Sequence, residues 1–247
     1  MKMIKGILGY IWKAYFFLIV LFTIILFYPI FLVVLMQEKY FSIGFKCVRL
    51  QAKIILLLIG IRRIEFGEFP KDNRSYIICS NHSSYLDILL LSASISSYFV
   101  FLGKKELGSV PLFNIYFKRM NILIDRGNPK ASHNAINKAI QEMEKGSSVV
   151  IFPEGTISNT VPVMKPFKNG AFKVAIENKI PILPISFPRN YLLLQDTWTI
   201  DSKCGPGLAE IHFHKPIEPS SKDYQDLITL RERTREIIQS KLLDGSR

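Results

Sequence analysis

The chain has 247 residues, with 32 Lys plus Arg against 20 Asp plus Glu, so its formal net charge is +12. Apolar residues make up 49% of it and the mean hydropathy is +0.21, which excludes a disordered or collagen-like chain and favours membrane association. Its three cysteines are too few and too scattered for a disulfide framework or a paired-cysteine zinc site. A reducing compartment is therefore expected.

The apolar excess is concentrated near the N-terminus. Residues 14–36 carry no charge, and as a helix they would be ~34 Å long, enough to span a bilayer. Cations flank this run on both sides, which favours both ends being cytoplasmic. Lys46, Arg49 and Lys53 form a basic stripe on a second apolar helix, as in elements that lie in the headgroup plane. We predict that residues 1–61 form a monotopic helical pair on the cytoplasmic face of the cell membrane, with a transmembrane anchor as the alternative.

The remaining residues, 62–247, have the composition of a single α/β domain. Runs of β-branched and aromatic residues predict buried strands at 76–79, 99–102, 122–124, 149–152, 182–187 and 209–213. Helical patterns fall at about 84–96, 106–118, 129–145, 167–178 and 222–242. This alternation predicts a mostly parallel central sheet flanked by helices.

Polar side chains follow each of the first four predicted strands. They are Asn81, His82 and Asp87; Gly103, Lys104 and Lys105; Asp125 and Arg126; and Pro153, Glu154, Gly155 and Thr156. Because ligands of open α/β sheets bind beyond the carboxyl ends of the strands, we expect these groups to converge on one crevice.

Together these groups supply a base, a carboxylate to orient it and several cations, which suits chemistry on a phosphate-bearing substrate. His82 is placed in the turn before a helix and Asp87 in the first turn, from which the carboxylate can reach back to the imidazole. Such a histidine is a general base of fixed tautomer. Residues 84–87 also fit the capping-box pattern, and the two roles are compatible.

These motifs resemble those of the 1-acyl-sn-glycerol-3-phosphate acyltransferases, which are glycerolipid acyltransferases with an HxxxxD motif. The resemblance rests on Asn81-His82-Ser83-Ser84-Tyr85-Leu86-Asp87, on Phe152-Pro153-Glu154-Gly155-Thr156, on residues 103–107 with 124–126, and on the proline-rich stretch 180–184. It covers about residues 62–215. One departure is Ile157, which stands where the family often has an arginine.

The resemblance implies that His82 is the general base and Asp87 its partner. The resemblance also implies that the substrate phosphate is held by Lys104, Lys105 and Arg126. It further implies that the acceptor pocket is shaped by Asn81, Glu154, Gly155 and Thr156. The implied reaction moves an acyl chain from acyl carrier protein or coenzyme A to the 2-hydroxyl of lysophosphatidic acid, giving phosphatidic acid for phospholipid biosynthesis. No metal, no cofactor beyond this co-substrate and no nucleic acid is expected, and membrane lipids are the expected surroundings.

Several alternatives compete with this reading. Cys79 could act as a covalent nucleophile with the same His and Asp. Alternatively, Ser83 or Ser84 as nucleophile, or His82 activating water, could make the protein a lipid hydrolase or thioesterase. Glycerol-3-phosphate or another lysolipid could be the acceptor, and a basic tethering protein would not be an enzyme at all. For His212 and His214, which alternate on one strand, a solvated strand face is favoured over a zinc site.

Overall fold

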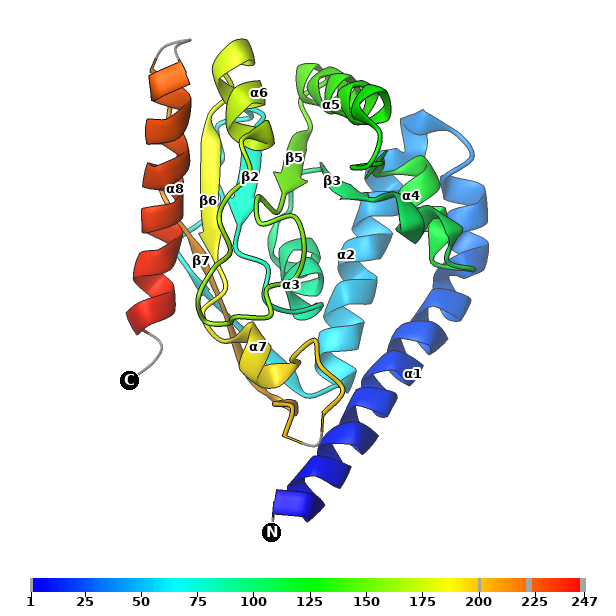
Figure 1. Cartoon of the computed structure of the whole chain (residues 1–247). Coiled ribbons are helices and arrows are strands. Elements are labelled where there is room, and N and C mark those ends of the chain that lie inside the picture. The colour runs from blue at the N-terminus through cyan, green and yellow to red at the C-terminus, as the bar shows by residue number, and fades with distance from the viewer. Residues whose placement is uncertain (1, 200, 221–223, 245–247) are drawn as a thin grey trace.

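The structure is a computed structural model that describes residues 2–199, 201–220 and 224–244. The described part of the chain forms one seven-stranded sheet with helices on both faces (Figure 1). In chain order the strands are β1 (Ile61–Phe66), β2 (Ile77–Ser80), β3 (Phe99–Lys104), β4 (Ile122–Ile124), β5 (Ser148–Ile151), β6 (Ile182–Ser186) and β7 (Gly207–Phe213). The α-helices are α1 (Lys2–Val34), α2 (Phe41–Leu58), α3 (Leu86–Ser94), α4 (Asn114–Arg119), α5 (Pro129–Glu144), α6 (Gly170–Asn178), α7 (Asn190–Leu193) and α8 (Tyr224–Asp244). The predicted α/β class is confirmed.

The strand order is β1-β7-β6-β2-β5-β3-β4, and every neighbouring pair is parallel except β6 with β7. The predicted mostly parallel sheet is therefore confirmed. Strand β2 lies between β6 and β5 and is buried along its whole length. A strand covered on both faces needs no polar alternation, which is why Ile77 to Cys79 reads as a continuous apolar run.

Successive residues of the central strands point to opposite faces and so enter different cores. Ile78 packs on the side of α1, α2 and α3, whereas Ile77 packs on the side of α5, α6 and α8. Because the strands on both sides of β2 run parallel to it, β2, β5, β3 and β6 all end at the same edge of the sheet. The loops that follow these strands therefore meet there.

The two predicted N-terminal helices are present as α1 and α2, joined by a 3-10 turn, η1 (Glu38–Tyr40). Phe31 of α1 and Phe45 of α2 belong to the same core as Ile78 of β2. Thus the helical pair packs on the α/β part of the chain, and the division at residue 61 stays a prediction. Most of α1 remains uncovered, since only 22% of its most apolar window is buried inside the protein.

Several predicted boundaries were wrong. Strand β1 was missed because half of its sequence, Ile-Arg-Arg-Ile-Glu-Phe, is charged, which an edge strand tolerates. The helix expected at 106–118 is split into η2 (Lys105–Ser109) and α4, because Pro111 and Leu112, with φ of 63°, interrupt it. Helix α6 begins at Gly170 and not at 167. Residues 222 and 223 of the last predicted helix lie outside the described residues.

Candidate active site

His82 and Asp87 form a hydrogen-bonded pair at the carboxyl edge of the sheet. The imidazole Nδ1 lies 3.0 Å from Oδ2 of Asp87, and the two side chains are 12% and 0% exposed. His82 follows β2 in a short turn, and Asp87 is in the first turn of α3, as expected. A carboxylate on Nδ1 leaves Nε2 of a neutral imidazole unprotonated, so that Nε2 can accept a proton.

The Asp87 carboxylate is surrounded by donors. Oδ2 also accepts the backbone N–H groups of Ser83, at 2.7 Å, and Ser84, at 3.0 Å, while the Ser84 hydroxyl accepts the N–H of Leu86 at 3.1 Å. These bonds are the reciprocal pattern of a capping box. Asp87 therefore holds the start of α3 and orients the imidazole at the same time.

A side-chain amide from a distant part of the chain also donates to Asp87. Asn190 of α7 is fully buried, and its Nδ2 donates to Oδ1 of Asp87 at 2.6 Å. With this bond both carboxylate oxygens have donors, which a buried charge requires. The sequence analysis did not single out Asn190, and its only local signal is a polar residue after the Phe187-Pro188 end of a buried strand.

Glu154 connects the turn at Phe152-Pro153-Glu154-Gly155-Thr156, the FPEGT turn, to the turn that carries His82. Its Oε1 accepts the backbone N–H of His82 and its Oε2 that of Lys165, both at 2.8 Å. Burial raises the pKa of Glu154, and these two bonds oppose that rise. The Phe152 ring stacks on the His82 imidazole, with ring centres 3.9 Å apart. Glu154 thus positions His82 from the neighbouring strand and does not reach solvent.

Asn81 has a similar bracing role. Its side chain accepts the N–H of Phe187 at 2.8 Å and donates to the Phe187 carbonyl at 3.0 Å. This pair of bonds joins the ends of β2 and β6. Asn81 is buried. It also lines a small pocket of about 10 Å³ together with His82, Ser83 and Glu154.

Two cations meet at Gly155. The Arg126 guanidinium donates to the Gly155 carbonyl, and a Cβ added at Gly155 would lie 3.0 Å from Nζ of Lys168 and 3.4 Å from Nη1 of Arg126. Gly155 has a φ of 82°, a conformation that disfavours any side chain. Lys168 was missed because the predicted helix included it, whereas it lies in the loop before α6.

The other predicted phosphate ligands lie apart from this pair. Lys104 and Lys105 are 62% and 67% exposed, and their ammonium groups contact Glu106 at 3.2 Å and Asp125 at 2.9 Å. Thr156 is exposed beside Gly155. Among the described residues, Arg126 and Lys168 therefore lie at Gly155, while Nζ of Lys165 donates to the Ile157 carbonyl at 3.2 Å, just after this turn.

Two apolar cavities lie on opposite sides of the sheet. One, of about 300 Å³, is bounded by α5, α6 and the ends of β3 to β5, with Arg126, Gly155 and Lys168 in its wall. The other, of about 100 Å³, is enclosed by α1, α2, α3 and β3. Phe101 lines the second cavity, and its ring is 6.5 Å from that of Phe152, on which His82 stacks.

The competing nucleophiles differ in their surroundings. Cys79 is fully buried, and burial raises the pKa of its thiol well above the usual range, which disfavours a thiolate. The Ser84 hydroxyl donates to the Leu194 carbonyl at 2.7 Å. The Ser83 hydroxyl is buried and has no hydrogen-bond partner among the described residues, and Ser83 lines the small pocket beside His82.

His212 and His214 do not form the solvated strand face that we expected. The His212 ring stacks on Phe66 at 4.4 Å, and Nε2 of His214 lies 2.7 Å from the Ser186 hydroxyl. Both histidines are half-buried, because α8 covers this end of the sheet. No group of three or more His, Cys, Asp or Glu side chains that could hold a metal occurs within the described ranges.

Comparison with known proteins shows the family of this chain. The model of the acyltransferase family matches residues 62–188. The chain is 31% identical over 182 residues to the 1-acyl-sn-glycerol-3-phosphate acyltransferase of Escherichia coli (strain K12), covering 71% of each chain. It is 34% identical over 158 residues to the enzyme of that name from Cocos nucifera, covering 63% of this chain and 49% of that one.

The chain therefore belongs to the acyltransferase family. Its relatives include 1-acyl-sn-glycerol-3-phosphate acyltransferases, which confirms the resemblance seen in the motifs. The chain spans about half the length of the Cocos nucifera relative. In structure it is similar to PlsC, the 1-acyl-sn-glycerophosphate acyltransferase of Thermotoga maritima, with a TM-score of 0.80 over 98% of both chains; at 22% identity this likeness concerns the fold.

Proposed function

We propose that this protein transfers an acyl chain from a thioester of acyl carrier protein or coenzyme A to the 2-hydroxyl of 1-acyl-sn-glycerol 3-phosphate. The products are phosphatidic acid and a free thiol. The observation that carries the proposal is the His82–Asp87 hydrogen bond of 3.0 Å at the edge of the sheet where Arg126 and Lys168 meet. Family membership supports the reaction type, and the names of the relatives support the acceptor.

In this mechanism Nε2 of His82 accepts the proton of the 2-hydroxyl while its oxygen attacks the thioester carbonyl carbon. The tetrahedral intermediate then collapses, the carbon–sulfur bond breaks, and the proton on His82 passes to the departing thiolate. Asp87 stays ionised and stabilises the imidazolium that forms. Ser83 has a buried hydroxyl without a partner in the same small pocket, and we propose that it donates to the developing oxyanion.

The acceptor's phosphate is proposed to bind at Arg126 and Lys168. Guanidinium groups bind phosphate in a bidentate manner and ammonium groups add a point charge. A side chain at position 155 would crowd both cations, since its Cβ would lie 3.0 Å from Nζ of Lys168 and 3.4 Å from Nη1 of Arg126. Fixing the phosphate restricts how the hydroxyl is presented to His82. Lys104 and Lys105, at the end of β3, remain predicted contacts of the phosphate.

The acyl chain of the donor is proposed to occupy the cavity between α1, α2 and α3. Its wall is mostly apolar and aromatic, as a hydrocarbon chain requires, and Phe101 and Phe152 connect that wall to the His82 ring. Ala52 is a small residue in this wall. Ala52→Phe should therefore shorten the acyl chain that the enzyme prefers.

The helical pair is proposed to hold the site at the membrane. Helix α1 is long and apolar enough to cross a bilayer by length and composition. The exposed cations Lys46 and Lys53 on α2 favour instead a pair lying in one leaflet on the cytoplasmic side. Acceptor and product are amphiphiles, so a site at the interface meets both of them there.

An activity assay tests the proposal. Detergent-solubilised protein is incubated with 1-acyl-sn-glycerol 3-phosphate and labelled acyl-coenzyme A or acyl carrier protein, and the lipids are separated by chromatography. We expect labelled phosphatidic acid, lost in His82→Ala and retained in His133→Ala, which changes an exposed histidine of α5. Free fatty acid in place of phosphatidic acid would show a hydrolase, and equal activity of the two variants would overturn the role of His82.

A further inference from the structure

An aromatic cluster holds the loop after α7 against the first half of α1. We call residues 194–199 the Trp198 loop. The Trp198 ring stacks on Phe17, with 5.8 Å between ring centres, and on Tyr10, at 6.1 Å. The Tyr10 hydroxyl donates to the Trp198 carbonyl at 2.7 Å, and Lys13 donates to a loop carbonyl while lying 5.3 Å from the centre of the Trp198 ring. These three residues of α1 share one helix face.

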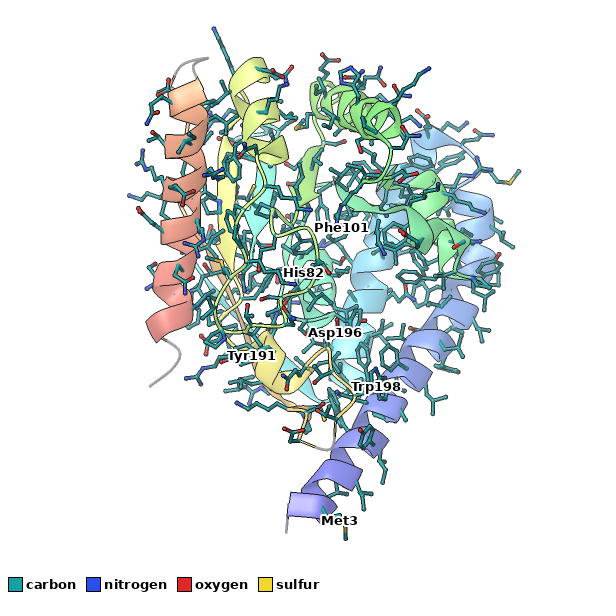
Figure 2. All side chains as sticks on the ribbon, in the orientation of Figure 1. Met3, His82, Phe101, Tyr191, Asp196 and Trp198 are labelled. Carbon is teal, nitrogen blue, oxygen red and sulfur yellow. The ribbon has the colours of Figure 1, made fainter. Side chains whose placement is uncertain are left out.

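The Trp198 loop also contacts the turn between His82 and α3. The Ser84 hydroxyl donates to the carbonyl of Leu194 at 2.7 Å. The Tyr85 ring lies edge-on to Phe17 of α1 at 6.2 Å. Burial and, secondarily, the nearby Asp196 carboxylate raise the pKa of Tyr85 to about 12, so this hydroxyl stays protonated. Figure 2 shows Asp196 and Trp198 between His82 and α1.

This cluster is open to solvent on its outer side. Although it stacks on two rings, Trp198 is 58% exposed, and Tyr85 is 40% exposed. Beside them α1 exposes Ile11 at 60% and Leu18 at 62%. Apolar surface therefore continues from α1 across the Trp198 loop to the first turn of α3. Contiguous apolar surface of this kind marks an interaction site.

We propose that the Trp198 loop is a second membrane-contacting element, which lies in the headgroup region of an anionic bilayer beside α1. Tryptophan and tyrosine prefer this region because the ring is apolar and the N–H or O–H is polar. The exposed cations Lys39, Lys46 and Lys53 of η1 and α2 attract anionic lipid and would repel a second copy of this chain. The bilayer is therefore the occupant that the charges favour.

The proposal has a consequence for the enzyme, and there it rests on the proposed function. Because the loop contacts both Ser84 and Tyr85, a bilayer in contact with Trp198 lies beside the turn that carries His82. A membrane-borne acceptor would then pass from the lipid to the site along the Trp198 loop without crossing water. The membrane contact itself can be tested without any activity.

Tryptophan fluorescence provides that test, because the chain has two tryptophans, Trp12 and Trp198. Trp12→Phe leaves Trp198 as the single reporter in the full-length protein. The protein is mixed with vesicles of phosphatidylcholine and phosphatidylglycerol, with or without bromine on the acyl chains near the headgroup. We expect a blue shift of the emission and roughly twofold quenching by the brominated lipid, as an interfacial tryptophan shows.

The matched control carries its only tryptophan on α8, at the other side of the molecule from α1 (Figure 1). This protein is Trp12→Phe/Trp198→Phe/Thr229→Trp, since Thr229 is exposed. Its emission should not respond to brominated lipid, while sedimentation shows that it binds the vesicles as well. Equal quenching at both positions, or no quenching at Trp198 in vesicle-bound protein, would overturn the proposal. So would failure to bind vesicles, or shielding of Trp198 by concentration-dependent self-association.

Activity separates this proposal from the proposed function. Trp198→Ser should lower acyl transfer to acceptor in vesicles by roughly tenfold, because the interfacial contact is lost, and should leave transfer in detergent micelles within about twofold. Equal loss in both media would show a structural effect on the site and overturn the proposal. Absence of transfer in the unchanged protein would refute the proposed function while the fluorescence result still stands.

Discussion

His82 and His214 each bind a neighbouring side chain through one ring nitrogen, yet their surroundings differ. His82 has the Asp87 carboxylate at 3.0 Å and lies at the mouth of a pocket. His214 has the Ser186 hydroxyl at 2.7 Å, and this hydroxyl also donates to the Ile238 carbonyl of α8 at 3.2 Å. The first pair faces a place where substrate can bind, whereas the second joins the sheet to a helix.

The charges around each ring account for the difference. Burial, then His212 and Lys241, lower the pKa of His214 to about 4, so His214 is neutral at physiological pH and serves as a structural hydrogen-bonding group. A carboxylate beside the ring, as at His82, stabilises the protonated imidazole that general-base catalysis produces. Burial lowers the pKa of His214, and its hydroxyl partner joins the sheet to α8, whereas His82 combines a carboxylate partner with a place in the wall of a pocket.

Replacement of the carboxylate should have the largest effect. Asp87→Asn keeps the shape of the side chain but presents no anion to the imidazolium and can fix the wrong tautomer, so we expect kcat to fall by roughly 10³-fold. Single-turnover transfer from labelled thioester measures this step. A variant with kcat within about tenfold of the original, a loss that geometry alone can cause, would contradict the role of Asp87.

The distant amide on Asp87 should have a smaller effect. Asn190→Ala removes the donor to Oδ1 but leaves the three contacts on Oδ2, so we expect kcat to fall roughly tenfold, with KM for the acceptor unchanged. The kcat and KM values are measured separately. A rise in KM with unchanged kcat would instead place Asn190 in substrate binding.

The second histidine should affect stability and its pH dependence. Because the folded-state pKa of His214 is lowered to about 4, the unfolded chain binds the extra proton between that value and its ordinary 6.5. Stability from this group is present above pH 6.5 and is lost as the pH falls toward 4, by about 2 kcal/mol between pH 7 and pH 5.

His214→Gln should remove this part of the pH dependence, since Gln does not titrate. Urea unfolding in detergent at pH 7 and pH 5 measures it as the difference between the two proteins. Parallel pH profiles of the original protein and the variant would refute the assignment. Acyl transfer at pH 7 should be the same in both proteins.

The smallest effect is expected at Ser186. Ser186→Ala removes the hydroxyl between His214 and Ile238, which should lower the free energy of unfolding by about 1–2 kcal/mol and leave acyl transfer unchanged. Thermal unfolding and the lipid assay check the two parts. A loss of activity comparable with that of His82→Ala would show that the His214–Ser186 pair is also needed for acyl transfer. It would contradict the distinction between His82 and His214.

Much of the fold, and the contact between His82 and Asp87, could be predicted from the local sequence. The apolar runs that became β2, β3, β5 and β6, and the helix that Pro129 begins, have strong local signals. The spacing of His82 and Asp87 is enough to predict their contact, because both belong to one turn and the helix after it. Strand β1 could not be found in this way, because its adjacent and frequent charges are tolerated in a strand at the edge of the sheet, where β1 pairs only with β7.

The sequence by itself determined which residues could perform chemistry, because a base, its carboxylate and the FPEGT turn are local patterns. Tertiary structure decided which cations and amides join them. Lys168 comes from the loop before α6 and Asn190 from α7, and the packing of α6 and α7 brings them to Gly155 and Asp87. Lys104 and Lys105 have the right charge and position in the sequence, but local carboxylates engage both. Contacts over such separations depend on how the layers pack, which the order of residues along one segment does not specify.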